Sequence, residues 1–399
     1  MERATEKAPR PFLGVHPDVV KLGAVSFLTD VSSEAIFSVF SIFFTTIAGA
    51  SAALLGMVEG FADFSASSLD YVSGWLSDRT GKRKVFAAAG YGFSTLAKFF
   101  LVIANSVSAL ALFRVVERLG KSFRGPPRDA WLAEVAATDT RGYSFGVHKA
   151  MDKAGAVAGP LLAFWLLSSL GETTHAFRLL FIGAALTAVL AVVVLLMIGE
   201  RPGRSAEREN IFCAWRTLDR GFRWYLLPAS VFSLAYFSFG FLLLRAYDAG
   251  FSIADVILLY ALFNAAFVAA SAPVGALGDR IGRRAVIMLG YVLYALMAAG
   301  FIFASAKWEI VILFVLFGVF YSIDEAQSKA FIADIEHARR GSAIGLYNFA
   351  TGLVYLPASI IAGWLWTINS AYAFEFAFVF AVAALVIFAA LGKKIRPTA

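Results

Sequence analysis

Acidic and basic side chains interrupt apolar segments in the first half of the chain, where they could bind and release protons. Asp30 and Glu34 fall in one such segment, Asp63 in the next, and Arg118 in a later one. Burial raises the pKa of a carboxyl group toward neutrality, whereas a nearby arginine lowers it. A carboxylate whose neighbours change during a conformational cycle would take up and release a proton. We therefore predict Asp30, Glu34 and Asp63 as proton-coupling residues and Arg118 as their switching partner.

The same charges also have a structural explanation. Spacing of about 100° per residue groups them into two helical stripes, one acidic and polar (Glu59, Asp63, Ser67, Asp70) and one basic (Arg114, Arg118, Lys121, Arg128). A charge at the bilayer centre costs at least about 2.5–3.5 kcal/mol, so such groups face protein or water and usually pair. Mutual neutralisation of the stripes would hold the helices together without any role in transport, and both explanations stand at this point.

Further polar residues are candidates for a substrate cavity. They are Arg114, Glu117, Lys121, His148, Asp152, Tyr236, Asn264, Asp324, Glu325 and Asn348. His148 and Asp152 are one helical turn apart, which suits either a proton relay or an ordinary i,i+4 structural pair. Charges gather in the first half of the chain, so we expect coupling there and an apolar or aromatic substrate wall in the second half.

The segments that carry these residues are too apolar for a water-soluble fold. Of 399 residues, 59% are hydrophobic and 16% are charged, whereas soluble domains are about 25% charged. A spanning helix needs about 20 apolar residues, and such runs predict an all-α membrane protein with twelve transmembrane helices. Pro126 and Pro127 are expected to kink or interrupt the fourth. The predicted spans are 20–48, 52–76, 84–105, 107–136, 143–169, 174–198, 223–247, 252–275, 284–305, 308–335, 340–366 and 370–392.

Charge in the loops predicts the orientation of these spans. Lysine and arginine cluster in alternate loops and in both tails, and the positive-inside rule assigns such loops to the cytoplasm. We therefore expect a multi-pass protein of the bacterial cytoplasmic (inner) membrane with both termini cytoplasmic. Residues 1–200 would form an N-terminal six-helix bundle and 223–399 a C-terminal one. Residues 201–222 would be a cytoplasmic linker with a surface helix around Ile211–Arg220.

A short signature occurs twice in the chain, half a chain apart. Its two copies differ by 201 positions and comprise Gly74, Asp78, Arg79, Gly81 and Arg83, then Gly275, Asp279, Arg280, Gly282 and Arg284. Six helices, a linker and six further helices of the same orientation make a parallel repeat, which is typical of transporters.

The doubled Gly-x-x-x-Asp-Arg-x-Gly-Arg/Lys-Arg loop resembles the signature of the major facilitator superfamily, between helices 2 and 3 and again between helices 8 and 9. The resemblance covers essentially the whole chain and implies two six-helix bundles, related by pseudo-twofold symmetry, that alternate access. It also implies that Asp78 meets the N-terminus of helix 11, near Gly341, when the cytoplasmic side is shut. The signature would then act as a conformational latch. The alternative is that its lysines and arginines only anchor the loop on the cytoplasmic side of the membrane.

A second resemblance lies on helix 5, where Gly155, Gly159 and Pro160 resemble the Gly-x-x-x-Gly-Pro antiporter motif of the family's exporters. The family pattern ends in two further glycines, but this chain has Ala163 and Phe164 there. Generic close helix packing explains the glycines equally well. Arg114 stands where the family has a buried arginine in helix 4.

Other classes of function lack a sequence signal. The chain has no Walker A sequence, no Cys/His metal cluster and only one cysteine, Cys213, and no nucleophile elbow. We therefore expect no enzymatic activity, no cofactor and no nucleic-acid partner. The expected partners are a small-molecule substrate, a coupling proton and the lipid bilayer, and the expected state is a monomer.

The resemblance implies a secondary active transporter, and the working prediction is proton-coupled efflux of a small organic compound, as by a drug/proton antiporter. One alternative is transport of an organic anion, a phosphorylated compound or a metal chelate on the basic stripe of helix 4. Another is a lipid flippase or a transporter-like sensor. The identity of the substrate and the direction of transport stay open, because the same fold imports or exports.

Overall fold

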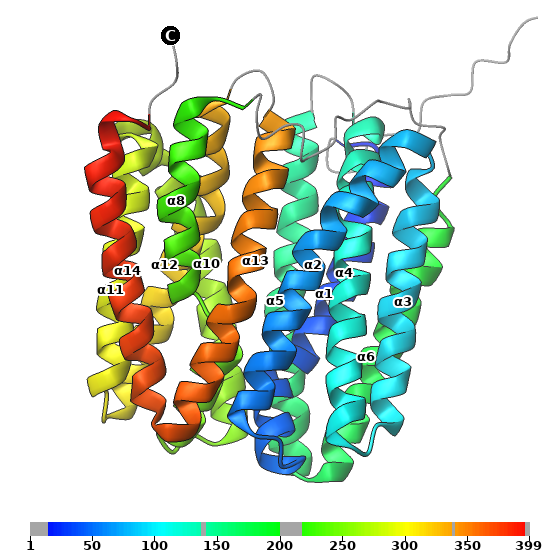
Figure 1. Cartoon of the computed structure of the whole chain (residues 1–399). Helices are drawn as coiled ribbons and strands as arrows, with labels where there is room; N and C mark the ends of the chain where they lie inside the picture. Colours follow the sequence, from blue (N-terminus) through cyan, green and yellow to red (C-terminus); the bar gives the residue numbers. More distant parts are fainter. Residues whose placement is uncertain (1–14, 137–140, 200–217, 337–339, 396–399) are drawn as a thin grey trace, which may run out of the picture.

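The computed structural model describes residues 15–136, 141–199, 218–336 and 340–395, which form long α-helices joined by short turns (Figure 1). No β-strand occurs among these residues. Nine of the described helical segments are long and apolar enough to cross a membrane. The prediction of an all-α membrane protein is therefore confirmed.

The N-terminal bundle contains the first six predicted spans. The first helix continues as a short π-helix, η1 (Phe43–Ile47). The helices are α1 (Pro17–Ile42), α2 (Ala52–Thr80), α3 (Arg83–Ile103), α4 (Val107–Val135), α5 (Arg141–Leu170) and α6 (Thr174–Leu196).

The C-terminal bundle repeats this arrangement with one difference, because its first span is broken into α8 and α9. Its elements are α8 (Arg220–Ala235), α9 (Gly240–Asp248), α10 (Ile253–Ile281), α11 (Arg283–Phe303), α12 (Lys307–Ile335), α13 (Arg340–Ile368), α14 (Ser370–Ala390) and the 3-10 turn η2 (Leu391–Lys393). With α8 and α9 counted together, the described residues contain the twelve predicted spans.

Local signals fix many helix ends. Ser51 and Ser106 cap α2 and α4, and each side chain accepts a hydrogen bond from a backbone amide of the first turn. Gly81 ends α2 with φ of +67°, and Gly282 follows α10 with φ of +89°. Glycine tolerates this left-handed region without steric penalty, so the signature glycines allow the sharp turns that the sequence predicts.

The two bundles meet along α2 with α13 and along α5 with α10. We call the end of the molecule with the α2–α3 and α10–α11 turns the basic face, since these turns carry Lys82 and Arg283. Near the other end, a methyl group on Gly56 would collide with the Ser359 backbone, and one on Gly363 would collide with Ala52. The bundles are therefore in close backbone contact at the opposite face.

One expectation about helix continuity is wrong in part, and a second is wrong. Helix α4 runs through Pro126 and Pro127, so of the predicted kink or interruption the interruption does not occur. The seventh span, expected to be continuous over 223–247, is broken at residues 236–239. Partners outside the helix stabilise this break, because Ser238 N–H donates to Ser359 Oγ (3.3 Å) and Gly240 N–H donates to Ser238 Oγ (3.2 Å). The expected surface helix Ile211–Arg220 lies almost wholly outside the described residues, and α8 begins at Arg220.

Candidate functional site

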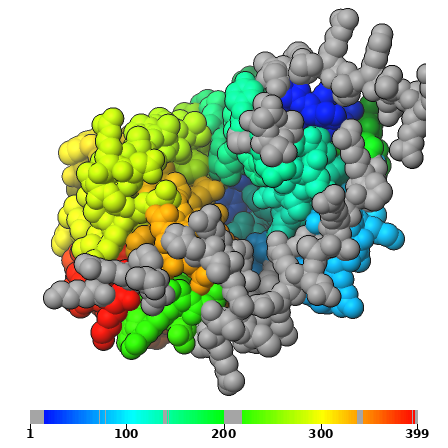
Figure 2. Space-filling view, turned by 90° about the horizontal axis from the view of Figure 1, so that it is seen from above, coloured from blue at the N-terminus to red at the C-terminus, as the bar shows by residue number. Residues whose placement is uncertain are grey.

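A cavity of about 580 Å³ lies between the two bundles. It runs from Phe37, Glu59 and Phe239, which lie toward the opposite face, to Arg128 and Lys329 on the side of the basic face. Viewed from above, Figure 2 shows the molecule hollowed between two lobes. Since the bundles touch at the opposite face, this conformation is open toward the basic face.

The two walls of the cavity differ in chemistry. Nine acidic and eight basic side chains line it, and all but Asp324, Glu325 and Lys329 come from the N-terminal bundle. Of its nine aromatic residues, all but Phe37 come from the C-terminal bundle. The cavity therefore has a charged wall and an aromatic wall.

A buried charge network fills the deep end of the charged wall. The Arg114 guanidinium binds Glu59 through two hydrogen bonds (2.6 and 2.8 Å) and lies 3.3 Å from Glu117. Ser33 donates to Glu117 (3.1 Å) and accepts from the Lys98 ammonium (2.9 Å), which is fully buried. Two acids and two bases therefore balance each other, as buried charges require.

Two of the three acids predicted for coupling pair with cations of the basic stripe. Arg118 pairs with Asp63 (2.6 Å), and Lys121 pairs with Glu34 (3.3 Å). The Tyr260 hydroxyl, from α10 of the other bundle, also donates to Glu34. In this conformation Arg118 therefore contacts neither Asp30 nor Glu34, and Glu34 links the two bundles.

Asp30 stands apart from these pairs. It lies at the middle of the 26-residue α1 and lines the cavity with 8% of its surface exposed. Within the part of the chain that the structure describes, its carboxyl group has no ion pair and no hydrogen bond. A buried carboxylate without a direct partner is destabilised in its charged form, so this position is suited to protonation.

Arg128, the remaining cation of the basic stripe, and its neighbour Arg124 are satisfied inside the N-terminal bundle. Arg124 donates to Ser94 (2.6 Å) and lies over the Tyr91 ring, 4.6 Å from its centroid. Arg128 pairs with Asp129 (2.9 Å) and approaches Asp152 (3.9 Å). The stripe is thus neutralised along its length by its own bundle.

His148 and Asp152 have separate partners. His148 shares a hydrogen bond with Ser26 (3.0 Å) and is not among the residues that line the cavity. Asp152 lines it and pairs with Lys149 (3.7 Å), which also reaches Glu325 of the other bundle (3.4 Å). Every other substrate-cavity candidate from the sequence lines the cavity, namely Arg114, Glu117, Lys121, Tyr236, Asn264, Asp324, Glu325 and Asn348.

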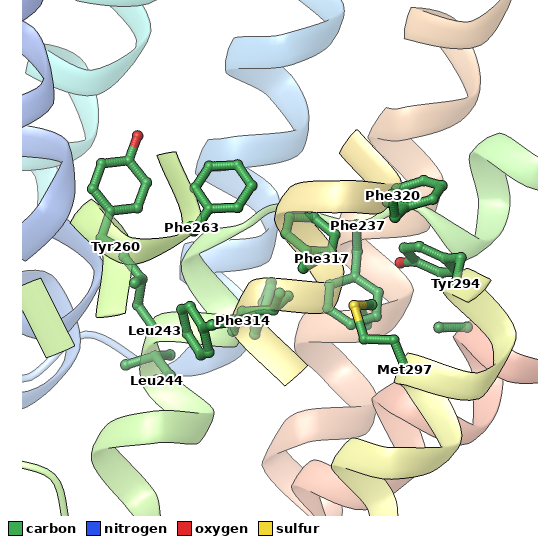
Figure 3. Packing of buried hydrophobic residues seen from close by; sticks show 14 of the residues in the cluster. Phe237, Leu243, Leu244, Tyr260, Phe263, Tyr294, Met297, Phe314, Phe317 and Phe320 are labelled. Atoms are coloured by element: carbon green, nitrogen blue, oxygen red, sulfur yellow. The ribbon is translucent and has the colours of Figure 1, made fainter. Parts of the chain in front are cut away.

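The aromatic wall is built on a continuous apolar cluster. Phe317 packs between Phe263 and Phe320, with ring centroids 5.3 and 5.7 Å apart (Figure 3). In Figure 3 the Tyr260 hydroxyl points away from this cluster. Sequence reasoning missed Tyr260, although it lies one helical turn before Asn264 and therefore on the same face.

The signature loops make structural contacts on the basic face. Arg83 pairs with Glu134 (3.2 Å), and Lys84 caps the end of α6 through the Ile198 carbonyl (2.6 Å). In the second copy Arg283 pairs with Asp334 (3.0 Å), whereas Arg284 caps the end of α14.

These contacts align the two signature copies one residue differently from the sequence match. Helices α3 and α11 begin at Arg83 and Arg283, which are 200 positions apart, whereas the turn glycines differ by 201. The first turn has one extra residue, Lys82. The sequence match of Arg83 with Arg284 is therefore wrong, and the structural counterpart of Arg83 is Arg283.

The predicted latch is not tested in this conformation. The Asp78 side chain is not among those that the structure describes, so its contact with the N-terminus of α13, near Gly341, stays a prediction. In the second copy the Asp279 side chain is 73% exposed, and a methyl group on Gly275 would meet open space. Arg79 lies over the Trp75 ring, and Arg280 is exposed. The exposure of Asp279 and Arg280 agrees with a cavity that opens on the basic face.

The helix 5 glycines pack against α1. Methyl groups on Gly155 and Gly159 would collide with the backbone at Phe27 and Val31. Helix α5 continues through Pro160 to Leu170. This contact places Asp30 and Asp152 on neighbouring helices at the cavity.

Comparisons with known proteins agree with this architecture. The sequence pattern of the Major Facilitator Superfamily matches residues 22–252 and 229–399. The chain is 32% identical over 372 residues to an uncharacterized MFS-type transporter of Methanocaldococcus jannaschii, and the match covers 92% of each chain. It is 30% identical over 136 residues to the multidrug resistance protein MdtH of Cronobacter sakazakii, 33% of each chain. The crystal structure of the nucleoside transporter NupG has the same fold, with a TM-score of 0.73 at 16% identity over 95% of this chain and 99% of that one.

Proposed function

The chain belongs to the Major Facilitator Superfamily, and we propose that it exports a small organic compound in exchange for protons by alternating access. Asp30 carries this proposal, because it is buried at the middle of α1, faces the cavity and has no direct partner among the described residues. In the proposed cycle Asp30 takes up a proton in one conformation and loses it in the other, as its neighbours change.

The direction and orientation are part of the proposal. The positive-inside rule assigns the basic face to the cytoplasm, so the cavity described above would load substrate from the cytoplasm. The partial similarity to a multidrug resistance protein supports export. We further propose that residues 1–200 and 223–399 move as two bundles about a cytoplasmic linker over 201–222.

The ion pairs weigh against the alternative of an anion on the basic stripe. Arg114, Arg118 and Lys121 each have a carboxylate partner. An anionic solute would have to displace those carboxylates. The buried Glu59 would then be left without its cation, at a cost of about 3–5 kcal/mol by comparison with broken buried pairs.

Transport assays with Asp30→Asn test the proposal. A thermal-shift screen of purified protein first identifies a ligand that binds. Protein in liposomes is then exposed to that ligand, and proton movement is followed with trapped pyranine. We expect ligand-driven proton movement with the wild type, and its loss with Asp30→Asn, while ligand-for-ligand exchange continues because that exchange needs no proton.

The control is Glu375→Gln, which removes an exposed carboxylate of α14 that lies outside the cavity lining. This variant should behave as the wild type. Proton movement that survives Asp30→Asn would contradict the assignment. Ligand binding without any flux in the wild type would instead favour a transporter-like sensor, and flux of labelled lipid alone would favour a flippase.

A further inference from the structure

The aromatic wall carries a carboxylate that lacks a cationic partner. Asp324 of α12 lines the cavity, accepts a hydrogen bond from Ser328 (3.4 Å) and has no ion pair within the described ranges. Its neighbour Glu325 differs, because Lys149 of the other bundle neutralises it (3.4 Å). Lys329 lies five residues on, about 140° around the helix, and its charge acts on Asp324 without an ion pair between them.

Tyrosine and phenylalanine rings surround this part of the wall. Tyr321 lies one helical turn from Asp324 and packs on Phe263 (5.6 Å between ring centroids) and Phe267 (5.3 Å). On α13, Tyr355 packs on Tyr236 at the break between α8 and α9 (5.6 Å). Aromatic faces attract cations, by about 0.5–2 kcal/mol per ring depending on desolvation. A lone carboxylate beside such rings is suited to a cation.

One ammonium group already lies over a ring that packs against this wall. Lys153, which belongs to α5 of the N-terminal bundle, lies over the Phe267 ring, 4.4 Å from its centroid, and Phe267 packs on Tyr321 of the wall. Among the residues described, Lys153 has no carboxylate within ion-pair distance. An aromatic ring beside the wall therefore holds an alkylammonium by its face, independently of any argument from Asp324.

From these observations we infer that Asp324 and the adjoining tyrosines bind the cationic centre of an amphipathic organic cation. Its apolar body would pack on the rings, and the cavity of about 580 Å³ is within the usual range of small-molecule sites, about 300–1,000 Å³. This inference rests on the proposed export function and specifies its substrate class. It places the substrate on the C-terminal bundle and the coupling proton on Asp30 of the N-terminal bundle, so the two do not compete for one carboxylate.

Binding of two ions of similar shape and opposite charge tests the inference. Tetraphenylphosphonium is titrated into purified protein by calorimetry at one fixed pH, and titration into protein-free micelles is subtracted. Tetraphenylborate is the anionic counterpart. We expect the cation to bind the wild type and the anion, titrated in a separate experiment, not to bind.

Variants locate the site. Asp324→Asn should weaken tetraphenylphosphonium binding about 10- to 100-fold, the range for losing a charged interaction, and Asp324→Glu should retain most of the affinity. Tyr355→Leu should weaken binding about 2- to 30-fold, whereas Tyr355→Phe, which keeps the ring, should not. Glu375→Gln is again the matched control. Size-exclusion chromatography and circular dichroism verify that each variant is folded.

Three results would overturn the inference: no cation binding to the wild type, binding of tetraphenylborate with an affinity equal to that of the cation, or wild-type affinity in Asp324→Asn. If Asp324→Asn does not fold, Tyr355→Leu decides, and unchanged affinity in that variant rejects the site. Because binding is measured at one pH without a gradient, the outcome does not depend on proton coupling. If the Asp30→Asn transport test fails, the cation-binding result still stands. If the cation-binding test fails, the transport result still stands.

Discussion

The buried pair of Glu59 and Arg114 provides the sharpest test of the charge network. The Glu59 side chain is 1% exposed and that of Arg114 is 8% exposed. Together with Glu117 and Lys98 they form a balanced set of four charges. Glu59→Gln leaves one uncompensated positive charge, Arg114→Gln leaves one uncompensated negative charge, and the double variant restores the balance.

The expected magnitudes follow from burial. Removing one partner of a buried ion pair costs about 3–5 kcal/mol, so each single variant should lose that much free energy of unfolding. The double variant should lose less than the sum of the two, by at least about 1.5 kcal/mol, a coupling within the range for residues in contact. Interhelical hydrogen bonds in membranes couple by only about 0.6 kcal/mol on average, so the charged pair is distinguishable from an ordinary polar contact.

Reversible unfolding in mixed micelles, followed by tryptophan fluorescence, measures all four proteins. The pair of Asp18 and Lys21 serves as a control, because Lys21 is 44% exposed and solvent screening should limit that coupling to roughly 0.5 kcal/mol. A coupling for Glu59 and Arg114 no larger than that of the control would refute the reasoning, since it would mean that water in the cavity already solvates Arg114.

Two further predictions concern the basic face. Arg83→Ala should lower the free energy of unfolding by about 1–3 kcal/mol, because the largely buried arginine no longer pairs with Glu134. Arg283→Ala should lower it by less than about 1 kcal/mol, because the pair with Asp334 is partly exposed. Equal losses for the two variants in the same unfolding assay would contradict this dependence on burial. Cys213, the single cysteine, should react with a membrane-impermeant maleimide only after cells are permeabilised, and labelling of sealed cells would reverse the proposed orientation.

The sequence was sufficient to predict the helices because the physical signals are strong and local. Apolar runs of spanning length, separated by turns such as Gly81–Lys82 and by capping serines, define where helices start and end. The break at residues 236–239 could not be predicted in the same way. It depends on Ser359 of α13, which accepts from the Ser238 amide, and nothing in residues 223–247 reveals a partner more than a hundred positions away.

The site was predictable in its residue types but not in its pairing. Helical spacing placed Arg118 and Lys121 on one stripe, and that much is visible from sequence. Which acid each cation meets depends on the depth at which the facing helices cross. The sequence left Asp30, Glu34 and Asp63 open as partners of Arg118, and the structure pairs it with Asp63. For the same reason, the isolation of Asp30 emerges only when all neighbouring helices are in place.

The contacts between the bundles explain how one set of helices could serve both ends of the transport cycle. On α2, small residues from Ala52 to Gly60 lie in close contact with α13, whereas Asp70, closer to the basic face, lines the cavity. At the same end the Asp279 side chain is 73% exposed and pairs with Arg283 of its own bundle (3.5 Å), so it is accessible from the basic face. Rocking of one bundle against the other would close the basic face, which holds the signature loops, and would open the opposite face by separating the glycine contacts near Gly56. Glu34 would then lose Tyr260 of the other bundle, and the electrostatic surroundings of Asp30, one helical turn away, would change with it. The proposed proton exchange thus requires no moving part beyond the interface that already separates the charged wall from the aromatic one.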